Sequence, residues 1–323
     1  MTSEFAAIAR ILTTLPRPPD SSQVWIGDDA AVLPAPSSGH VLWAADTVVA
    51  GVHADLALTG MADFGWKAMA ASLSDLAAMG AEPAHSLVTV AGPAGTDLDL
   101  LYQGLAAASQ EYGCPIVGGD LTGAGVLVVT VAVSGTCDGE PVLRSGASPG
   151  DLIWVSGPLG AAAAGLRYLR ARAACGQAPA RIPKSEGLPE LDRPAEVDVD
   201  LLVRAHSRPS AAIASGRAAR LGGATAMIDV SDGLAADLSH VAVASGVGIR
   251  LEYVPVAPGA TLDEAMGGGD DYVLAFCSPE SAPIEEAFHG LELPIRIGTC
   301  TSDPTERTIA GDRFATTGWE HLL

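Results

Sequence analysis

The stretch that most constrains the fold is residues 61–83, MADFGWKAMAASLSDLAAMGAEP, which predicts a single buried helix. Its apolar residues recur at helical spacing, and Gly80 followed by Pro83 indicates where the helix ends. Asp75 lies in the middle of this helix on a strip of small residues, where a short acid is a poor helix former and has no helix end to cap. A solvated face is the simpler interpretation, because most charged side chains are exposed. The alternative is an inward-facing ligand on a rigid element, which gains weight if similar acids recur elsewhere.

Acids of this kind do recur, at the ends or breaks of apolar segments and mostly beside glycine. Each one alone is typical of a turn or a helix cap. Together they would repel one another unless divalent cations were bound, and carboxylates with several waters favour Mg²⁺, which usually binds a polyphosphate in such sites. The pattern therefore predicts nucleotide-dependent phosphoryl chemistry. The further acids are Asp28, Asp29, Asp46, Asp120, Asp229, Asp232, Asp270 and Asp271.

The charge balance limits the partners that the chain can bind. With 38 acidic against 18 basic residues the net charge is −20, which argues against nucleic acid or an anionic membrane as the main partner. Lysine occurs only at Lys67 and Lys184, and neither lies in a glycine turn of the P-loop type. The charge of a phosphorylated substrate must therefore be met by arginine, backbone amides or bound cations.

The cysteines and the N-terminal residues indicate the compartment. The 5 cysteines are odd in number and widely spaced, without any C-x-x-C, so the sequence predicts neither a disulfide framework nor a zinc site. Glu4 stands where a signal peptide would carry positive charge, and no apolar run reaches the ~18 residues of a membrane span. We therefore expect a cytoplasmic protein without a membrane partner.

Strand and helix patterns intermix along the chain, and its 323 residues favour two domains. We expect an N-terminal domain over residues 1–137 and a C-terminal α/β domain over 138–323. Residues 171–200 are rich in Ala, Pro, Arg and Glu without a clear period, which predicts a mobile loop. Expected strands are 24–33, 41–49, 84–90, 126–134, 151–156, 224–230 and 272–276, and expected helices are 61–83, 97–112, 161–169, 210–221 and one that begins near residue 234.

In the second half of the chain, the sequence makes a specific prediction for each of two turns that precede a helix. The glycines of the turn 157–160, GPLG, predict an open helix N-terminus that is able to take an anion. In the later turn, Ser231 or Asp232 is expected to cap the helix that follows. Capping does not explain Asp229, which stands at the end of an apolar strand.

Several motifs occur in order between about residue 4 and residue 321: IGDDAAVL, DTVVAGVH, KAMAASLSDLAAMGAEP, GGDLTG, RSGASPGD, IDVSDGLAADLSH, GGGDDY and GWEH. They resemble the successive motifs of the thiamine-monophosphate kinase family. This family is part of the ATP-binding superfamily of aminoimidazole ribonucleotide synthetase. SDLAAMGA and D-x-SDGL together are specific, whereas GGD alone would not be.

The resemblance implies an α/β (α+β) chain with the two-domain aminoimidazole ribonucleotide synthetase-like fold. Its N-terminal domain would bind ATP and Mg²⁺ and pair through its sheet in a homodimer, and its C-terminal domain would be an α/β domain. The implied reaction is phosphorylation of thiamine monophosphate by ATP to thiamine diphosphate, with several Mg²⁺ ions. By motif position the magnesium ligands are Asp29, Asp46, Asp75, Asp120, Asp229 and Asp232, the ATP contacts are Gly119, Asp120, Arg144 and Ser231, and the substrate contacts are His53, Asp270 and Trp319.

No residue is expected to act as a general base. The nucleophile is a phosphate oxygen, largely ionised near neutral pH because its second pKa is ~6. Magnesium ions and Arg144 would stabilise the charge of the transferred group, as is usual for phosphoryl transfer. Two of the implied substrate contacts have simpler structural interpretations, His53 as a loop residue and Trp319 as a core anchor.

Some positions depart from the family pattern and keep alternatives open. Ala44 and Ala45 stand where hydroxyl residues are usual, Leu121 replaces threonine, and Asp270 replaces glutamate. A nucleotide-binding paralogue without kinase activity is one alternative. A sister ATP-dependent activity of the superfamily is another. The dehydratase relative, however, would end in a cysteine-bearing tail, whereas this chain ends in EHLL. The selenophosphate relative would carry an early cysteine, whereas the first cysteine here is Cys114.

Overall fold

The structure is a computed structural model that describes residues 10–16, 38–175, 197–316 and 318–319. The chain divides into two compact units. The first comprises Met1–Leu76 and Glu82–Glu140, and the second comprises Ala77–Ala81 and Pro141–Leu323. The expected strand 24–33, and with it Asp28 and Asp29, lies outside the described residues.

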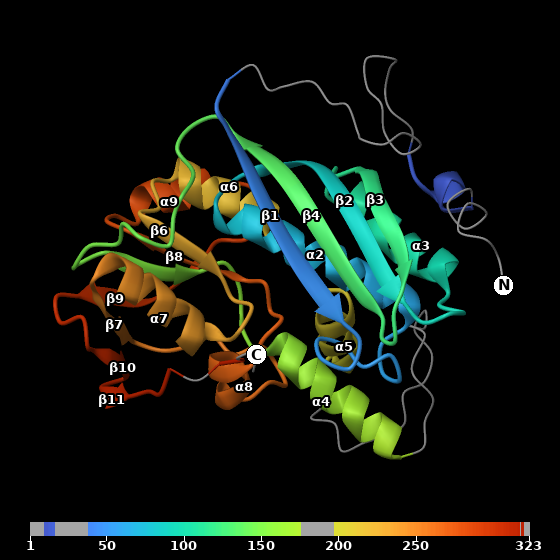
Figure 1. Ribbon diagram of the computed structural model, residues 1–323. Helices are drawn as coiled ribbons and strands as arrows, with labels where there is room; N and C mark the ends of the chain where they lie inside the picture. Colours follow the sequence, from blue (N-terminus) through green and yellow to red (C-terminus); the bar gives the residue numbers. More distant parts are fainter. Residues whose placement is uncertain (1–9, 17–37, 176–196, 317, 320–323) are drawn as a thin grey trace. The chain divides into compact units, whose positions relative to one another are not determined.

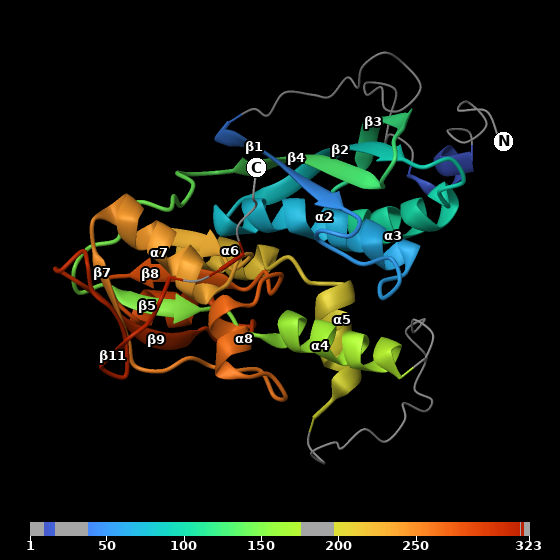
Figure 2. The ribbon, with the colours of Figure 1, turned by 60° about the horizontal axis from the view of Figure 1, so that its bottom comes forward.

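The first unit is a four-stranded sheet that carries two helices on one face (Figures 1 and 2). The strand order is β1-β4-β2-β3, in which β2 and β3 are parallel and the other neighbours are antiparallel. The strands expected at 41–49, 84–90 and 126–134 and the helices expected at 61–83 and 97–112 are confirmed. The elements are β1 His40–Val49, α2 Met61–Ala78, β2 Glu82–Gly92, α3 Leu98–Glu111, β3 Ile116–Gly123 and β4 Val128–Cys137.

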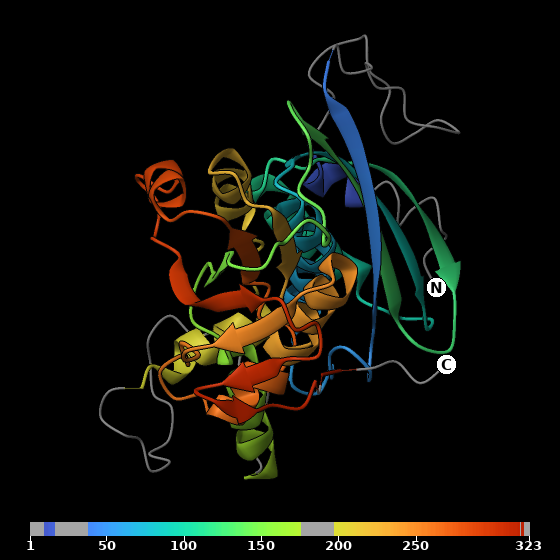
Figure 3. The ribbon, with the colours of Figure 1, turned by 90° about the vertical axis from the view of Figure 1, so that its left-hand side faces the viewer.

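Alternation along the strands creates the buried face of this sheet. On β4, Val129, Val131 and Val133 are fully buried, while the residues between them are at least partly accessible. The two helices beneath approach each other closely at Gly104, because a Cβ there would lie 1.7 Å from the carbonyl oxygen of Ala62. Figure 3 shows this sheet nearly edge-on, with both helices on the same side.

The second unit is built on a seven-stranded sheet with the order β11-β10-β7-β9-β5-β8-β6. Its central strands are antiparallel, since β5 pairs with both β8 and β9, and β6 pairs with β8. The elements are β5 Leu152–Val155, α4 Ala161–Ala174, α5 Val199–Ser207, α6 Ile213–Leu221, β6 Ala226–Asp229, α7 Leu234–Ser245, β7 Gly248–Leu251, α8 Leu262–Gly267, β8 Leu274–Ser278, α9 Ala282–Ala287, β9 Ile295–Thr301, β10 Arg307–Ile309 and β11 Asp312–Arg313.

Both faces of this second sheet are buried. Ile153 and Val155 point into a core that includes residues of α7, whereas Trp154 between them points into a second core formed with α6 and α9. In the second core the rings of Trp154, Phe276 and Phe288 stack in series, with centroids 6.3 and 6.0 Å apart. The sheet is therefore covered on both sides by helices of its own unit.

The structure corrects the expectation of one long loop. The loop expected over 171–200 is helical at both ends, because α4 continues to Ala174 and α5 begins at Val199, while residues 176–196 lie outside the described part. Asp198 caps α5 by accepting hydrogen bonds from the N–H groups of Asp200 and Leu201. No helix in the described part of the chain is long and apolar enough to cross a membrane.

Candidate functional site

Asp46 lies on the helix-covered face of the first sheet. Side chains alternate along β1, so Leu42 and Val48 lie on the same face as Asp46, and both are buried. The backbone N–H of Asp46 donates to Oγ of Ser72 on α2 (3.3 Å). Ser72 in turn donates to the carbonyl oxygen of Val131 on β4 (2.8 Å). This contact fixes α2 beneath β1 and β4.

Asp75 follows Ser72 by three residues on α2 and therefore lies on the same side of the helix, one turn further along. The small residues beside it, Ala71 and Ala78, are buried rather than solvated. Asp75 itself is half-buried. The interpretation of this strip as a solvated face is therefore wrong, and α2 carries Asp75 on the side that faces the strand of Asp46.

The alanines before Asp46 are not equivalent. Alternation along β1 places Ala44 on the face of Asp46 and Ala45 on the opposite face, where it is exposed. Only position 44 could therefore offer a hydroxyl group on the same face of the sheet as the Asp46 carboxylate.

Gly119 and Asp120 lie inside β3, so Asp120 is in neither a turn nor a helix cap. Glycine is required at 119, because a Cβ would lie 1.8 Å from the carbonyl oxygen of Val88 on β2. Asp120 pairs in register with Thr89 and is exposed. Burial, followed by the negative charge of Asp120, raises the pKa of Tyr102 on α3 to about 12.

His53 follows β1 in a turn that fixes its ring. Nδ1 accepts a hydrogen bond from the backbone N–H of Val49 (2.9 Å), and the N–H of His53 donates to the carbonyl oxygen of the same residue (3.0 Å). Because Nδ1 acts as the acceptor, the proton of the neutral ring is on Nε2. The turn thus presents an N–H donor.

Four of the expected site residues of the second unit, but not Arg144, gather at one edge of its sheet. Since β5 and β6 are both antiparallel to β8, their carboxyl ends lie beside the start of β8. The carbonyl oxygen of Ser231 accepts the N–H of Asp270 (2.9 Å), and that of Asp232 accepts the N–H of Trp319 (3.0 Å). The structure therefore brings together Ser231, Asp232, Asp270 and Trp319. Asp229, the last residue of β6, is buried and precedes Ser231 by two residues in the sequence.

The side chain of Trp319 is not part of a core. It is 52% exposed, so the interpretation of this residue as a core anchor is wrong. Gly318 allows the approach to the turn, because a Cβ there would lie 2.9 Å from the carbonyl oxygen of Asp232.

The cap of α7 differs from the expectation. Neither Ser231 nor Asp232 caps the helix, which begins after Gly233 without a side-chain cap. Instead Oδ2 of Asp237, within the first turn, accepts the N–H groups of Asp232 and Gly233 (3.1 Å each). Burial, followed by the charges of Asp232 and Asp229, raises the pKa of Asp237 to about 7. An acid in a first turn is a local signal that could have identified Asp237.

The open N-terminus expected before α4 exists, but a carboxylate of the chain itself occupies it. Gly160 has φ +87° and provides no side-chain cap. Oδ2 of Asp271 accepts the N–H of Gly160, and Oδ1 accepts the N–H of Ala162 (3.0 Å). Burial raises the pKa of Asp271 to about 6 although these hydrogen bonds favour the charged form. Sequence alone offers no signal for this pairing between distant segments.

The loop that carries Arg144 is held by Ser245, a residue that no sequence motif predicted. Oγ of Ser245, at the end of α7, accepts the N–H groups of Gly146 and Ala147 (3.2 Å each) and donates to the carbonyl oxygen of Arg144 (3.4 Å). Arg144 itself is exposed. A helix end thus fixes the backbone from which the arginine extends.

The acidic side chains at the candidate site are of a kind that could bind a divalent cation. The charges of Asp229 and Asp232 act on Asp237, so these carboxylates lie close enough to repel one another, and hard oxygen donors suit Mg²⁺. In the described part of the chain, however, no group of three or more Asp, Glu, His or Cys side chains is arranged to hold a metal ion by itself. The expected ligand set also includes Asp29, which is outside that part. The complete magnesium cluster stays a prediction.

Comparison with known proteins places this geometry in a family. Residues 27–137 match the model of the AIR synthase related protein, N-terminal domain, and residues 148–311 match the model of its C-terminal domain. The thiamine-monophosphate kinase of Salmonella typhimurium is 34% identical, with 99% of this chain and 98% of that protein aligned.

Solved structures agree with the sequence relatives. The crystal structure of thiamine-monophosphate kinase from Stenotrophomonas maltophilia K279a superimposes with a TM-score of 0.79 at 30% identity, over 97% of this chain and 98% of that one. The structure of AaThiL complexed with AMPPCP and TMP has a TM-score of 0.73 at 28% identity, over 99% and 97% of the two chains. The chain therefore belongs to the thiamine-monophosphate kinase family, within the AIR synthase-related proteins.

Proposed function

We propose that this chain transfers the γ-phosphoryl group of ATP directly to the phosphate of thiamine monophosphate, giving thiamine diphosphate and ADP. The observation that carries the proposal is the meeting of the Ser231–Asp232 turn with Asp270 and Trp319 at one edge of the second sheet. These are a predicted nucleotide contact, a predicted metal ligand and two predicted substrate contacts. Membership of the family and the AaThiL complex with AMPPCP and TMP support the same reaction.

Magnesium is the proposed cofactor, held by carboxylates. Its ions would neutralise phosphate charge and align the attacking and leaving oxygens. The mutual repulsion of the acids around α7 supports the proposal, because a cation would relieve it. The proposed ligands are Asp29, Asp46, Asp75, Asp120, Asp229 and Asp232.

The chain's own residues would bind and orient the two substrates. Arg144, on the loop fixed by Ser245, contributes positive charge to the nucleotide phosphates, and Gly119 is a further proposed nucleotide contact. His53 donates from Nε2 to the acceptor phosphate. No side chain removes a proton from the nucleophile, because that oxygen is already ionised near neutral pH.

We also propose that the face of the first sheet opposite to α2 and α3 forms the homodimer. Val41 and Trp43 on β1 are 45% and 68% exposed, and Leu87 on β2 is 38% exposed. Alternation and register place all three on the face opposite to α2 and α3. An exposed apolar patch of this kind marks an interaction surface. Trp43→Glu should convert a dimer to a monomer in light scattering, and an unchanged mass would contradict this interface.

The reaction is tested by incubating the purified chain with ATP, MgCl₂ and thiamine monophosphate and separating the thiamine phosphates by chromatography. We expect thiamine diphosphate and ADP in equal amounts, and no product when EDTA removes the metal. Binding of ATP without formation of thiamine diphosphate would contradict the proposal and support the non-catalytic paralogue.

A further inference from the structure

Asp271 joins two segments that are far apart in the sequence. Its carboxylate binds the N–H groups of Gly160 and Ala162 at the start of α4, 111 and 109 residues away. The neighbouring residues hold the other side of the same loop. The N–H groups of Asp270 and Tyr272 donate to the carbonyl oxygens of Ser231 and Val230 (2.9 Å each). The loop before β8 is therefore fixed between the ends of β5 and β6.

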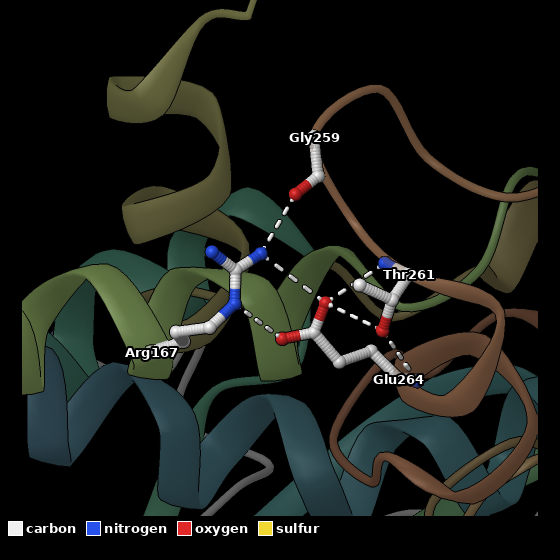
Figure 4. A network of polar contacts seen from close by, with 4 residues as sticks. All are labelled: Arg167, Gly259, Thr261 and Glu264. Atoms are coloured by element: carbon white, nitrogen blue, oxygen red, sulfur yellow. Dashed lines mark hydrogen bonds and ion pairs between the residues drawn. The ribbon is translucent and has the colours of Figure 1, made fainter. Parts of the chain in front are cut away.

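A second contact ties α4 to the segment that leads into this loop, and Figure 4 shows it. Nε of Arg167 on α4 donates to Oε1 of Glu264 on α8 (2.7 Å), and its Nη2 donates to the carbonyl oxygen of Gly259 (2.8 Å). Thr261 and Glu264 form a capping box at the start of α8. Thus α4 holds both ends of the segment 259–271.

The residues beside Asp271 have backbone conformations that need such support. Asp270 has φ +69° and Tyr272 has φ +50°, which is uncommon for residues with a side chain. The hydroxyl group of Tyr272 donates to Oδ1 of Asp270 (3.1 Å). Strained residues of this kind persist only where the surrounding contacts determine them, and they concentrate at functional sites.

We propose that Asp271 is a positioning residue for the thiamine substrate: by binding the amides at the start of α4, it fixes the loop that directs the Asp270 carboxylate at the substrate. The proposal rests on the function proposed above. It also means that the start of α4 does not bind a substrate phosphate, because the chain supplies the anion itself. A role in stability alone explains the geometry less well, since burial of the carboxylate raises its pKa to about 6 and thus opposes its charged form.

The test compares Asp271→Asn with Asp263→Asn, an acid-to-amide change on the exposed side of nearby α8. Asparagine keeps the shape but turns a donor toward an amide N–H, so one hydrogen bond is lost. For Asp271→Asn we expect the KM for thiamine monophosphate to rise about tenfold, while the KM for ATP and the melting temperature stay close to wild type. Asp263→Asn should leave all three quantities unchanged.

A second variant keeps the test decisive if Asp271→Asn folds poorly. Tyr272→Phe removes only the hydroxyl bond to Asp270, and it should raise the KM for thiamine monophosphate about threefold in a fully folded protein. Equal increases in the KM values for both substrates, or an unchanged KM for thiamine monophosphate in both folded variants, would overturn the proposal.

Amide hydrogen exchange separates this inference from the proposed function. In Asp271→Asn, exchange should become faster in residues 157–163 and 266–273 together, whether or not thiamine monophosphate is the substrate. Unchanged exchange in either segment would overturn the link between them. A wild-type chain that forms no thiamine diphosphate, with coupled exchange intact, would instead overturn only the proposed function.

Discussion

Helices α4 and α7 of the second unit begin in the same way but obtain their anions differently. Both start after a glycine with positive φ, Gly160 at +87° and Gly233 at +119°, and neither has a side-chain N-cap. At α7 the carboxylate comes from Asp237 in the helix itself. At α4 it comes from Asp271 across the sheet edge. A helix start can therefore shape its own turn or join distant segments.

The difference matters for the site because each acid organises different residues. Asp237 holds the backbone of the turn that carries Ser231 and Asp232, which are proposed nucleotide and metal contacts. Asp271 holds the loop that carries Asp270, a proposed substrate contact. The start of α7 thus supports the loop with the proposed metal and nucleotide contacts, and the start of α4 supports the loop with a proposed substrate contact.

The largest effect should follow from removing a charge at the α7 turn. We expect Asp232→Asn to lower kcat by about 10²–10³-fold, because a proposed magnesium ligand is lost, while stability changes little. Steady-state rates at several Mg²⁺ concentrations, with Asp263→Asn as the matched control, measure it. Turnover close to wild type at limiting Mg²⁺ would remove Asp232 from the metal site.

The glycines at the helix starts should be more sensitive than a glycine at a helix end. In Gly160→Ala and Gly233→Ala the new Cβ would lie 2.8 Å from backbone atoms of α8, in addition to the unfavourable φ. We expect each to lower the free energy of unfolding by about 3 kcal/mol. Gly246, after α7, has φ +70°, but no atom lies within 4 Å of the Cβ that alanine would add. For Gly246→Ala we therefore expect the free energy of unfolding to fall by only about 1 kcal/mol. Urea denaturation measures all three, and equal losses would refute the close approach.

The α4 start should also show in the pH dependence of stability. The pKa of Asp271 is about 6 in the folded chain against an ordinary value of 3.8, so the folded state binds the proton more tightly. This stabilisation is complete below about pH 4 and is lost as the pH rises through about 6. When the pH rises from about 4.5 to 7.5, the free energy of unfolding of the wild type should fall by about 2 kcal/mol relative to that of Asp271→Asn. Parallel denaturation curves would show that the carboxylate is not perturbed.

The smallest effect should come from the ion pair behind the α4 start. Glu264→Gln removes the charge that pairs with Arg167 but keeps an acceptor for the capping box at Thr261. We expect the free energy of unfolding to fall by about 0.5–1 kcal/mol and the KM for thiamine monophosphate to stay within twofold of wild type. Glu306→Gln, which breaks the similar pair with Arg250, is the control for stability. A larger KM change for Glu264→Gln than for Asp271→Asn would reverse the order of importance that we assign.

Local signals were sufficient to predict most of the fold. The alternation of valines predicted β4, and the helical spacing in residues 61–83 predicted α2, because one buried face determines each element. Helix α5 was not predicted, since its few apolar residues follow a long stretch without a period. Asp120 lies in a strand rather than in a turn or a helix cap, because Gly119 beside it permits close contact between β3 and β2.

The site was only partly predictable, for a physical reason. Ser231, Asp232 and Asp270 were predicted from their motifs, and the sheet register brings them together. The supporting residues were not identified. The partner of Asp271 depends on which strands are neighbours, and Ser245 acts on a loop about a hundred positions away. Contacts of this range are set by topology rather than by local pattern.

The central claim is direct transfer of a phosphoryl group to thiamine monophosphate, and γ-labelled ATP tests it most directly. With Mg²⁺ and thiamine monophosphate present, we predict that the label appears in thiamine diphosphate in step with the formation of ADP. Label released only as inorganic phosphate, or retained in ATP while thiamine monophosphate is bound, would contradict the account.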